Sequence, residues 1–79
     1  MNKTILLFKN SGVTTIKIVL EPWVHLYPLG ADKTVEVRVE DPTVNLPIEI
    51  EYVHDEIILH AGQVMSVWAN GVELDPQFR

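Results

Sequence analysis

The sequence has 79 residues, of which 47% are hydrophobic and 22% are charged, with no cysteine and a formal net charge of −5. This length is enough for one small domain, and the absence of cysteine excludes disulfides, zinc ribbons, iron–sulfur clusters and thiol chemistry. The longest apolar run, residues 5–8, is too short for a membrane span or the apolar part of a signal peptide. We therefore expect a soluble cytoplasmic protein that does not bind membranes.

The charge is divided unevenly along the chain. Residues 1–39 carry five basic and three acidic side chains, whereas residues 40–79 carry one basic and eight acidic side chains. Binding to a phosphate backbone needs clustered Lys and Arg, so nucleic acid is not an expected partner. The acidic stretch 40–56 is either a solvated surface that keeps the domain soluble or a face that docks on a basic protein.

The first predicted strand is apolar on both faces. Residues 5–8 are all hydrophobic, which is typical of a central strand or of an edge strand covered by a neighbouring subunit. Asn10, Ser11 and Gly12 then predict a hairpin loop with the glycine in the left-handed conformation, so that residues 1–20 form a hairpin. Within residues 14–20, apolar and polar positions alternate, which indicates a half-buried strand.

Residues 21–30 form the most unusual segment. Trp23, His25 and Tyr27 stand at alternate positions, so in an extended chain their rings lie on one side. Aromatic side chains with polar groups are favoured at interfaces. We therefore predict a binding surface of Trp23, His25 and Tyr27, with Trp68 as a neighbour; the alternative is that Trp23 and Tyr27 close one open end of the domain.

Alternation continues through the second half of the chain. Residues 34–40 are predicted to form a half-buried strand, and residues 48–54 another, with Ile48, Ile50 and Tyr52 facing the core. Asn70-Gly71 predicts a type I′ turn within a hairpin over residues 64–74, because both central residues of that turn need positive φ. No long segment shows helical periodicity, so we expect no helix beyond a single turn.

These elements predict an all-β fold. The expected architecture is a small two-layer antiparallel β-sandwich or flattened barrel of about seven short strands, Greek-key or jelly-roll-like in its connections. Residues 1–75 would form this single domain and residues 76–79 a C-terminal tail. Because so small a core without disulfides is marginally stable, association with a second copy or with another protein is expected.

Few side chains are arranged for chemistry. Neither Ser11 nor Ser66 lies in a Gly-x-Ser-x-Gly elbow, and no phosphate-binding or dinucleotide motif occurs. We therefore expect no enzymatic activity and no cofactor. The histidines leave one alternative open, a metal site, although the sequence has no His-x-His pair. Its candidate ligands are His54, Glu56 and His60, or His25 with Glu21.

The chain resembles a group of short uncharacterised bacterial β proteins. The resemblance rests on Leu20-Glu21-Pro22-Trp23, Tyr27-x-Leu29-Gly30, Val67-Trp68 and the stretch Asn70-Gly71-Val72-Glu73-Leu74. In those proteins a Glu-Pro-Trp-Gly stretch precedes a Leu-x-Pro-Gly corner, whereas this chain has Val24 and Leu29 at the glycine and proline positions. The resemblance implies an all-β fold and no particular activity. Similarity to cupins and cupredoxins is limited to architecture, because the metal ligands of both are lacking.

Taken together, the residues predict a small non-enzymatic binding or protein-interaction module that self-associates. The metal site is the alternative function.

Overall fold

The computed structural model describes residues 2–41 and 47–78, and these residues form β-strands and no helix. The strands are β1 (Asn2–Lys9), β2 (Ile16–Glu21), β3 (His25–Leu29), β4 (Thr34–Asp41), β5 (Glu49–Val53), β6 (Glu56–His60), β7 (Val64–Ala69), β8 (Val72–Glu73) and β9 (Gln77–Phe78). Accordingly, the described part of the chain has no helix that is long and apolar enough to cross a membrane.

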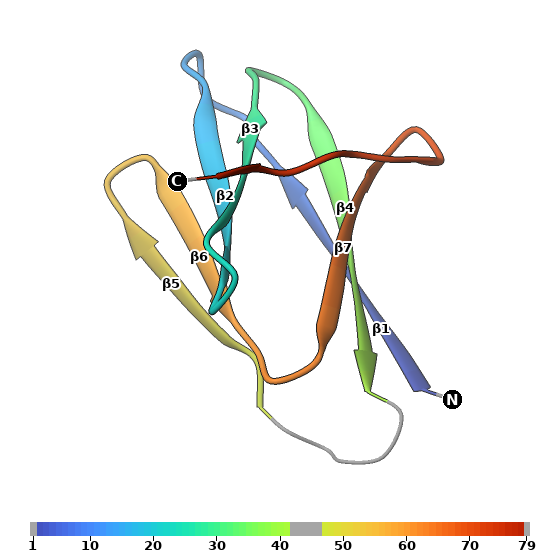
Figure 1. The fold of residues 1–79 in the computed structure, drawn as a ribbon. Coiled ribbons are helices and arrows are strands. Elements are labelled where there is room, and N and C mark those ends of the chain that lie inside the picture. The colour runs from blue at the N-terminus through green and yellow to red at the C-terminus, as the bar shows by residue number, and fades with distance from the viewer. Residues whose placement is uncertain (1, 42–46, 79) are drawn as a thin grey trace.

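The strands form two sheets that pack face to face (Figure 1). One sheet has the order β1-β4-β7-β8 and the other the order β5-β6-β2-β3-β9. The last segment of the chain crosses from the first sheet to the second, where β9 pairs with β3 (Figure 1). The predicted two-layer β-sandwich is therefore confirmed, with nine short strands in place of about seven. One pair, β2 with β6, is parallel, so the second sheet is mixed.

The core lies between the inner faces of the two sheets, as the alternation of apolar residues predicts. In β4 the three valines are buried while the charged residues between them are only partly covered. The core residues with almost no exposed surface are Ile18, Val19, Leu20, Leu29, Val37, Val39, Leu59 and Val67. The half-buried strand predicted over 34–40 is thus confirmed as β4. The strand predicted over 14–20 is present as β2, but it is not half-buried, because the consecutive residues Ile18, Val19 and Leu20 are all buried.

The two predicted hairpins have different outcomes. Asn70 and Gly71 have φ angles of 53° and 78°, and β7 pairs with β8 across them, which confirms the turn. The hairpin over residues 1–20 is wrong, because β1 pairs with β4 and lies in a different sheet from β2. Gly12 has no positive φ; its small size matters instead, since a Cβ there would lie 3.2 Å from the Asn10 Oδ1.

The strands at the edges of the two sheets differ from what the sequence predicts. Ile50 and Tyr52 of β5 face the core side, opposite Leu59 and Ile57, but they remain 50% and 72% exposed because β5 is an edge strand. The first strand, β1, lies at the edge of its sheet and not in the centre; its covering by a neighbouring subunit stays a prediction. At the other end of the described chain, Gln77 and Phe78 of the predicted tail belong to the second sheet as β9.

Candidate functional site

The four residues of the predicted binding surface do not form one surface. Tyr27 is 4% exposed and belongs to the core. Trp68 lies on β7 in the first sheet, and Trp23 lies in the turn between β2 and β3 of the second. The prediction that the rings of residues 23, 25 and 27 share one side required an extended chain through Val24. The φ of Val24 is 60°, which lies in the left-handed region. The prediction of a continuous Trp23–His25–Tyr27 face is therefore wrong.

Trp23 and His25 belong to a smaller aromatic cluster that includes Phe78. The ring centroids of Trp23 and His25 are 6.4 Å apart, and those of His25 and Phe78 are 5.4 Å apart in an edge-on arrangement. Phe78 is 77% exposed and Trp23 is 38% exposed. Sequence reasoning missed Phe78, because only the pairing of β9 with β3 brings residue 78 opposite residue 25.

Trp68 takes part in a polar network on the outer face of the first sheet. The guanidinium carbon of Arg38 lies 3.8 Å from the Trp68 ring centroid, and Arg38 also forms an ion pair with Glu36. The indole Nε1 of Trp68 donates a hydrogen bond of 2.9 Å to the Ser66 hydroxyl. These contacts are made within the sheet, and they give Trp68 a role in joining β4 to β7.

Tyr27 has a shifted pKa. Burial raises the pKa of the Tyr27 phenol above its ordinary value of 10.0, and the nearby carboxylates of Glu73 and Asp75 raise it further. In the unfolded chain the phenol ionises near that ordinary value, so above about pH 10 the unfolded state releases a proton that the folded state retains. The contribution of Tyr27 to stability is therefore complete below about pH 10 and is lost as the pH rises towards the higher folded pKa.

This shift predicts a specific alkaline instability. The melting temperature of the native protein should fall more steeply between about pH 9 and pH 11 than that of Tyr27→Phe, which has no phenol to ionise. Differential scanning calorimetry at a series of pH values measures the two slopes, and Tyr52→Phe, at an exposed position, is the control. Equal slopes for the native protein and Tyr27→Phe would contradict the burial of this phenol.

The predicted metal ligands are separated in space. His54 lies in the turn before β6 and His60 at the end of β6, and five strand residues span roughly 16 Å. His25 pairs with Leu20, so Glu21 projects from the opposite face of the sheet. Within residues 2–41 and 47–78, no group of three or more His, Asp or Glu residues is placed to hold a metal ion.

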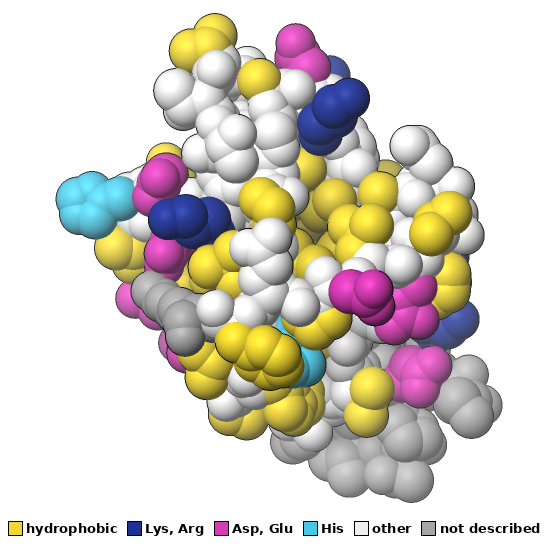
Figure 2. Space-filling model, turned by 45° about the horizontal axis from the view of Figure 1, so that its top comes forward, with side chains coloured by type: hydrophobic (Ala, Val, Ile, Leu, Met, Phe, Trp, Pro, Cys, Tyr) yellow, Lys and Arg dark blue, Asp and Glu magenta, His cyan; other side chains and the backbone are white. Residues whose placement is uncertain are grey.

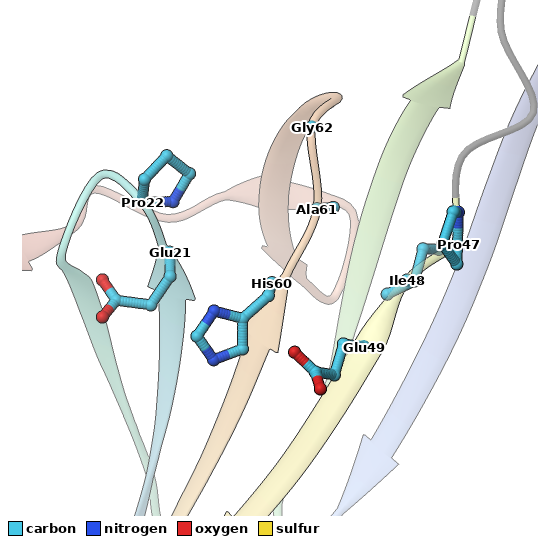
Figure 3. A pocket seen from close by; sticks show the side chains of 8 residues that line it. All are labelled: Glu21, Pro22, Pro47, Ile48, Glu49, His60, Ala61 and Gly62. Carbon is cyan, nitrogen blue, oxygen red and sulfur yellow. The ribbon is translucent and has the colours of Figure 1, made fainter.

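A cleft of about 610 Å³ lies at the end of the second sheet where β2 and β6 end (Figure 3). It is lined by Glu21, Pro22, Pro47, Ile48, Glu49, His60, Ala61 and Gly62. Three of these residues form one row across the sheet, because His60 pairs with Glu21 on one side and with Glu49 on the other. Sequence reasoning missed this row, since it depends on the parallel pairing of β2 with β6.

The polar side chains of the cleft differ in whether they have an interaction partner. The Nε2 of His60 lies 3.6 Å from the Oε1 of Glu51, which is beside the cleft on β5. The Oε1 of Glu21 is buried, and among the described residues it has no hydrogen-bond partner. A buried acceptor without a donor is costly, so this carboxylate oxygen lowers the stability of the fold at the end of β2.

The second distinctive feature is a pair of long, free sheet edges. In the sheets formed by the described residues, the outermost strands are β1 with eight residues, β5 with five, and β8 and β9 with two each. Hydrophobic side chains exposed on the two longer edges are Ile5, Leu7, Ile50, Tyr52 and Val53. Hydrophobic side chains also reach the surface elsewhere, as the end of the sandwich that faces the viewer in Figure 2 shows.

The two long edges have opposite charge. β1 contains two lysines, Lys3 and Lys9, and no acidic residue, whereas β5 contains two glutamates, Glu49 and Glu51, and no basic residue. Proteins protect an exposed edge by making it very short, by charged side chains, by proline or by a bulge. β8 and β9 are protected by their length, which leaves β1 and β5 protected only by their charges.

No protein-family model matches the chain, and no curated protein or solved structure matches it either.

Proposed function

We propose that the protein is a non-enzymatic protein-interaction module that self-associates, with β1 of one copy pairing with β5 of another. The observation that carries the proposal is the pair of long, unpaired and oppositely charged sheet edges. Addition of a strand to a free edge satisfies backbone N–H and C=O groups on both partners and buries the side chains beside them.

Pairing of β1 with β5 is favoured over pairing of either edge with itself. A symmetric β5 pair brings the Glu49 and Glu51 side chains of two copies together, and a symmetric β1 pair does the same for Lys3 and Lys9. Like charges opposite one another destabilise a strand pair, whereas opposite charges and apolar pairs stabilise it by about 0.2–1 kcal/mol each. Only the mixed pair combines lysines with glutamates.

An antiparallel register illustrates how well the two edges match. If Lys9 of one copy lies opposite Glu49 of the other, Phe8 lies opposite Ile50 and Leu6 lies opposite Tyr52. Leu6 and Phe8 are half-buried on the core side of β1, and Ile50 and Tyr52 are the exposed residues on the core side of β5. The register would therefore extend both the ladder and the apolar core across the interface.

Sedimentation velocity over a wide range of protein concentration tests this proposal. The native protein should form dimers or larger assemblies, and Lys9→Glu and Tyr52→Lys should each shift it towards the monomer. Lys9→Glu places a carboxylate opposite Glu49, and Tyr52→Lys places a charged group opposite the apolar Leu6. The matched controls are Lys33→Glu and Val13→Lys, which make the same kind of change at exposed positions outside the strands. A native protein that stays monomeric, or controls that dissociate it equally, would overturn the proposal.

A further inference from the structure

We infer that the open side of the sandwich, between β1 and β5, binds an extended segment of another protein as a tenth strand. This segment pairs with β1 and covers the core side of β5. It carries a carboxylate at each end and apolar side chains between them. The inference rests on the proposed function, because it uses the same free β1 edge, but it names a different partner that competes with a second copy for that edge.

Both long free edges border the same side of the sandwich. β8 and β9 are the last strands of their sheets, and only residues 74–76 separate them along the chain (Figure 1). A link of this length reaches about 14 Å, little more than the spacing of about 10 Å between packed sheets, so β8 and β9 close one side together. The strands at the other ends of the two sheets, β1 and β5, therefore border the opposite side.

The first sheet is one strand shorter than the second on this open side. It has four strands where the second has five, so among the described residues no strand lies opposite β5. The exposure of the β5 side chains agrees with this difference. Ile50 and Tyr52 point to the core side but are 50% and 72% exposed, whereas Leu59 on the neighbouring β6 has no exposed surface. A strand added beside β1 in the first sheet would fill the position over Ile50 and Tyr52.

The β1 edge requires an extended backbone from its occupant. β1 has eight residues, and within the described sheet it pairs only with β4. An added strand satisfies the N–H and C=O groups on its free side. A helix or a small molecule does not present a matching row of donors and acceptors over that length.

The side chains of β1 define the sequence pattern of the partner. The outer face of β1 carries Lys3 and Lys9 at its two ends, six residues apart. Between them on that face lie Ile5 and Leu7, and both are exposed. Opposite charges and apolar pairs stabilise neighbouring strands. The partner therefore needs two carboxylates six residues apart with apolar residues at the alternate positions between them, and its other face is apolar because it packs over β5.

A second copy of this chain matches that pattern only in part. In the register that places Lys9 opposite Glu49, the exposed Leu7 lies opposite the carboxylate of Glu51. β5 also ends at Val53, opposite Ile5, and does not reach Lys3. A segment with carboxylates only at its two ends is therefore a better match for the β1 edge than β5 is.

Binding of a designed peptide tests the inference. The probe is a blocked, fluorescently labelled peptide with the sequence Glu-Ile-Val-Phe-Val-Ile-Glu between Gly-Ser flanks. Fluorescence anisotropy measures its affinity at concentrations at which sedimentation shows the protein to be monomeric. The glutamate peptide should bind about tenfold more tightly than the same peptide with lysine at both ends. Equal affinities, or no binding of the glutamate peptide, would overturn the inference.

Charge reversal on β1 locates the peptide. Lys9→Glu should abolish the preference for the glutamate peptide, and Lys3→Glu combined with Lys9→Glu should reverse it. Lys33→Glu makes the same change at an exposed position outside the strands and should retain the native preference. An unchanged preference in the double variant would place the peptide elsewhere and refute the assignment.

Substitutions in β5 show whether the peptide completes the sandwich. Tyr52→Lys places a charge beneath the added strand, so it should weaken peptide binding although residue 52 lies in the other sheet. Val53→Lys places the same group on the outer face of β5, at another exposed position, and should leave the affinity unchanged. Circular dichroism checks that both variants are folded. Equal affinities in these two variants would exclude a position of the peptide over β5.

Failure of this inference and failure of self-association are measured separately. A protein that binds the glutamate peptide but stays monomeric at every concentration would overturn the proposed self-association alone. A protein that assembles but does not bind the peptide would overturn the inference alone.

Discussion

Replacement of Leu59 by alanine should lower the free energy of unfolding by about 3 kcal/mol, which is most of the stability expected for a single core of this size. Leu59 has no exposed surface and lies in β6, where it pairs with Leu20 on one side and Ile50 on the other. Leu20 also has no exposed surface, so the cavity left by truncation would be enclosed on that side and would not fill easily.

Urea denaturation followed by circular dichroism measures this loss, at one fixed protein concentration so that association does not differ between samples. The midpoint should move to a much lower urea concentration, and part of the Leu59→Ala protein should already be unfolded without denaturant. Val13→Ala is the matched control, because Val13 is 94% exposed and its truncation should change stability by less than about 0.5 kcal/mol. A midpoint close to the native one would mean that the packing around Leu59 is much looser than described.

Replacement of Asn10 should have the second largest effect on stability. The side-chain amide of Asn10 donates hydrogen bonds to the carbonyl oxygens of Thr14, at 2.7 Å, and Leu29, at 3.0 Å. Its Oδ1 accepts a hydrogen bond of 3.0 Å from the Gly12 amide, and its backbone bonds to Asp32 and Lys33. This one buried residue therefore joins the end of β1 to the end of β3 and to the connection before β4.

Asn10→Ala should destabilise the protein by about 1–3 kcal/mol, since one buried and two partly buried hydrogen bonds are lost and the buried carbonyl of Leu29 is left without this partner. Asn10→Asp keeps the shape of the side chain but removes its N–H donors. Its carboxylate can still accept the hydrogen bond from Gly12, but the other carboxylate oxygen faces two carbonyl oxygens. This variant should therefore be no more stable than Asn10→Ala. Thermal unfolding of both variants beside Ser11→Ala, at an exposed neighbour, gives the comparison. If Asn10→Asp were as stable as the native protein, the described amide contacts would be incorrect.

The sequence predicts those parts of the fold that depend on neighbouring residues. Alternation over residues 34–40 is sufficient to define β4, because successive side chains of a strand face opposite sides. The Asn70-Gly71 turn is likewise a property of two adjacent residues, both of which need positive φ. The prediction of the aromatic surface is wrong for a local reason as well. A single residue in the left-handed conformation, Val24, interrupts the extended chain that the prediction assumed.

The candidate cleft was beyond prediction because it depends on contacts between distant residues. Glu21 and Glu49 have no special spacing from His60 in the sequence, and they become its neighbours only when β2 joins β6 in parallel and β5 joins it in antiparallel orientation. The positions of the two free edges also depend on contacts between residues that are distant in the sequence. Residues 5–8 are compatible with a central or an edge strand, and only the complete order of the sheet decides between them.

The parallel pairing of β2 with β6 also has a consequence for biosynthesis. β2 ends at Glu21, but its parallel neighbour begins only at Glu56, so a nascent chain that has passed β2 by more than thirty residues still exposes one side of that strand. Topologies that rely on such distant pairing form slowly, because the loop must close before the contacts compensate for its entropy. During synthesis, β2 therefore has no parallel partner until β6 has been made. Over that interval its apolar side chains are available for aggregation.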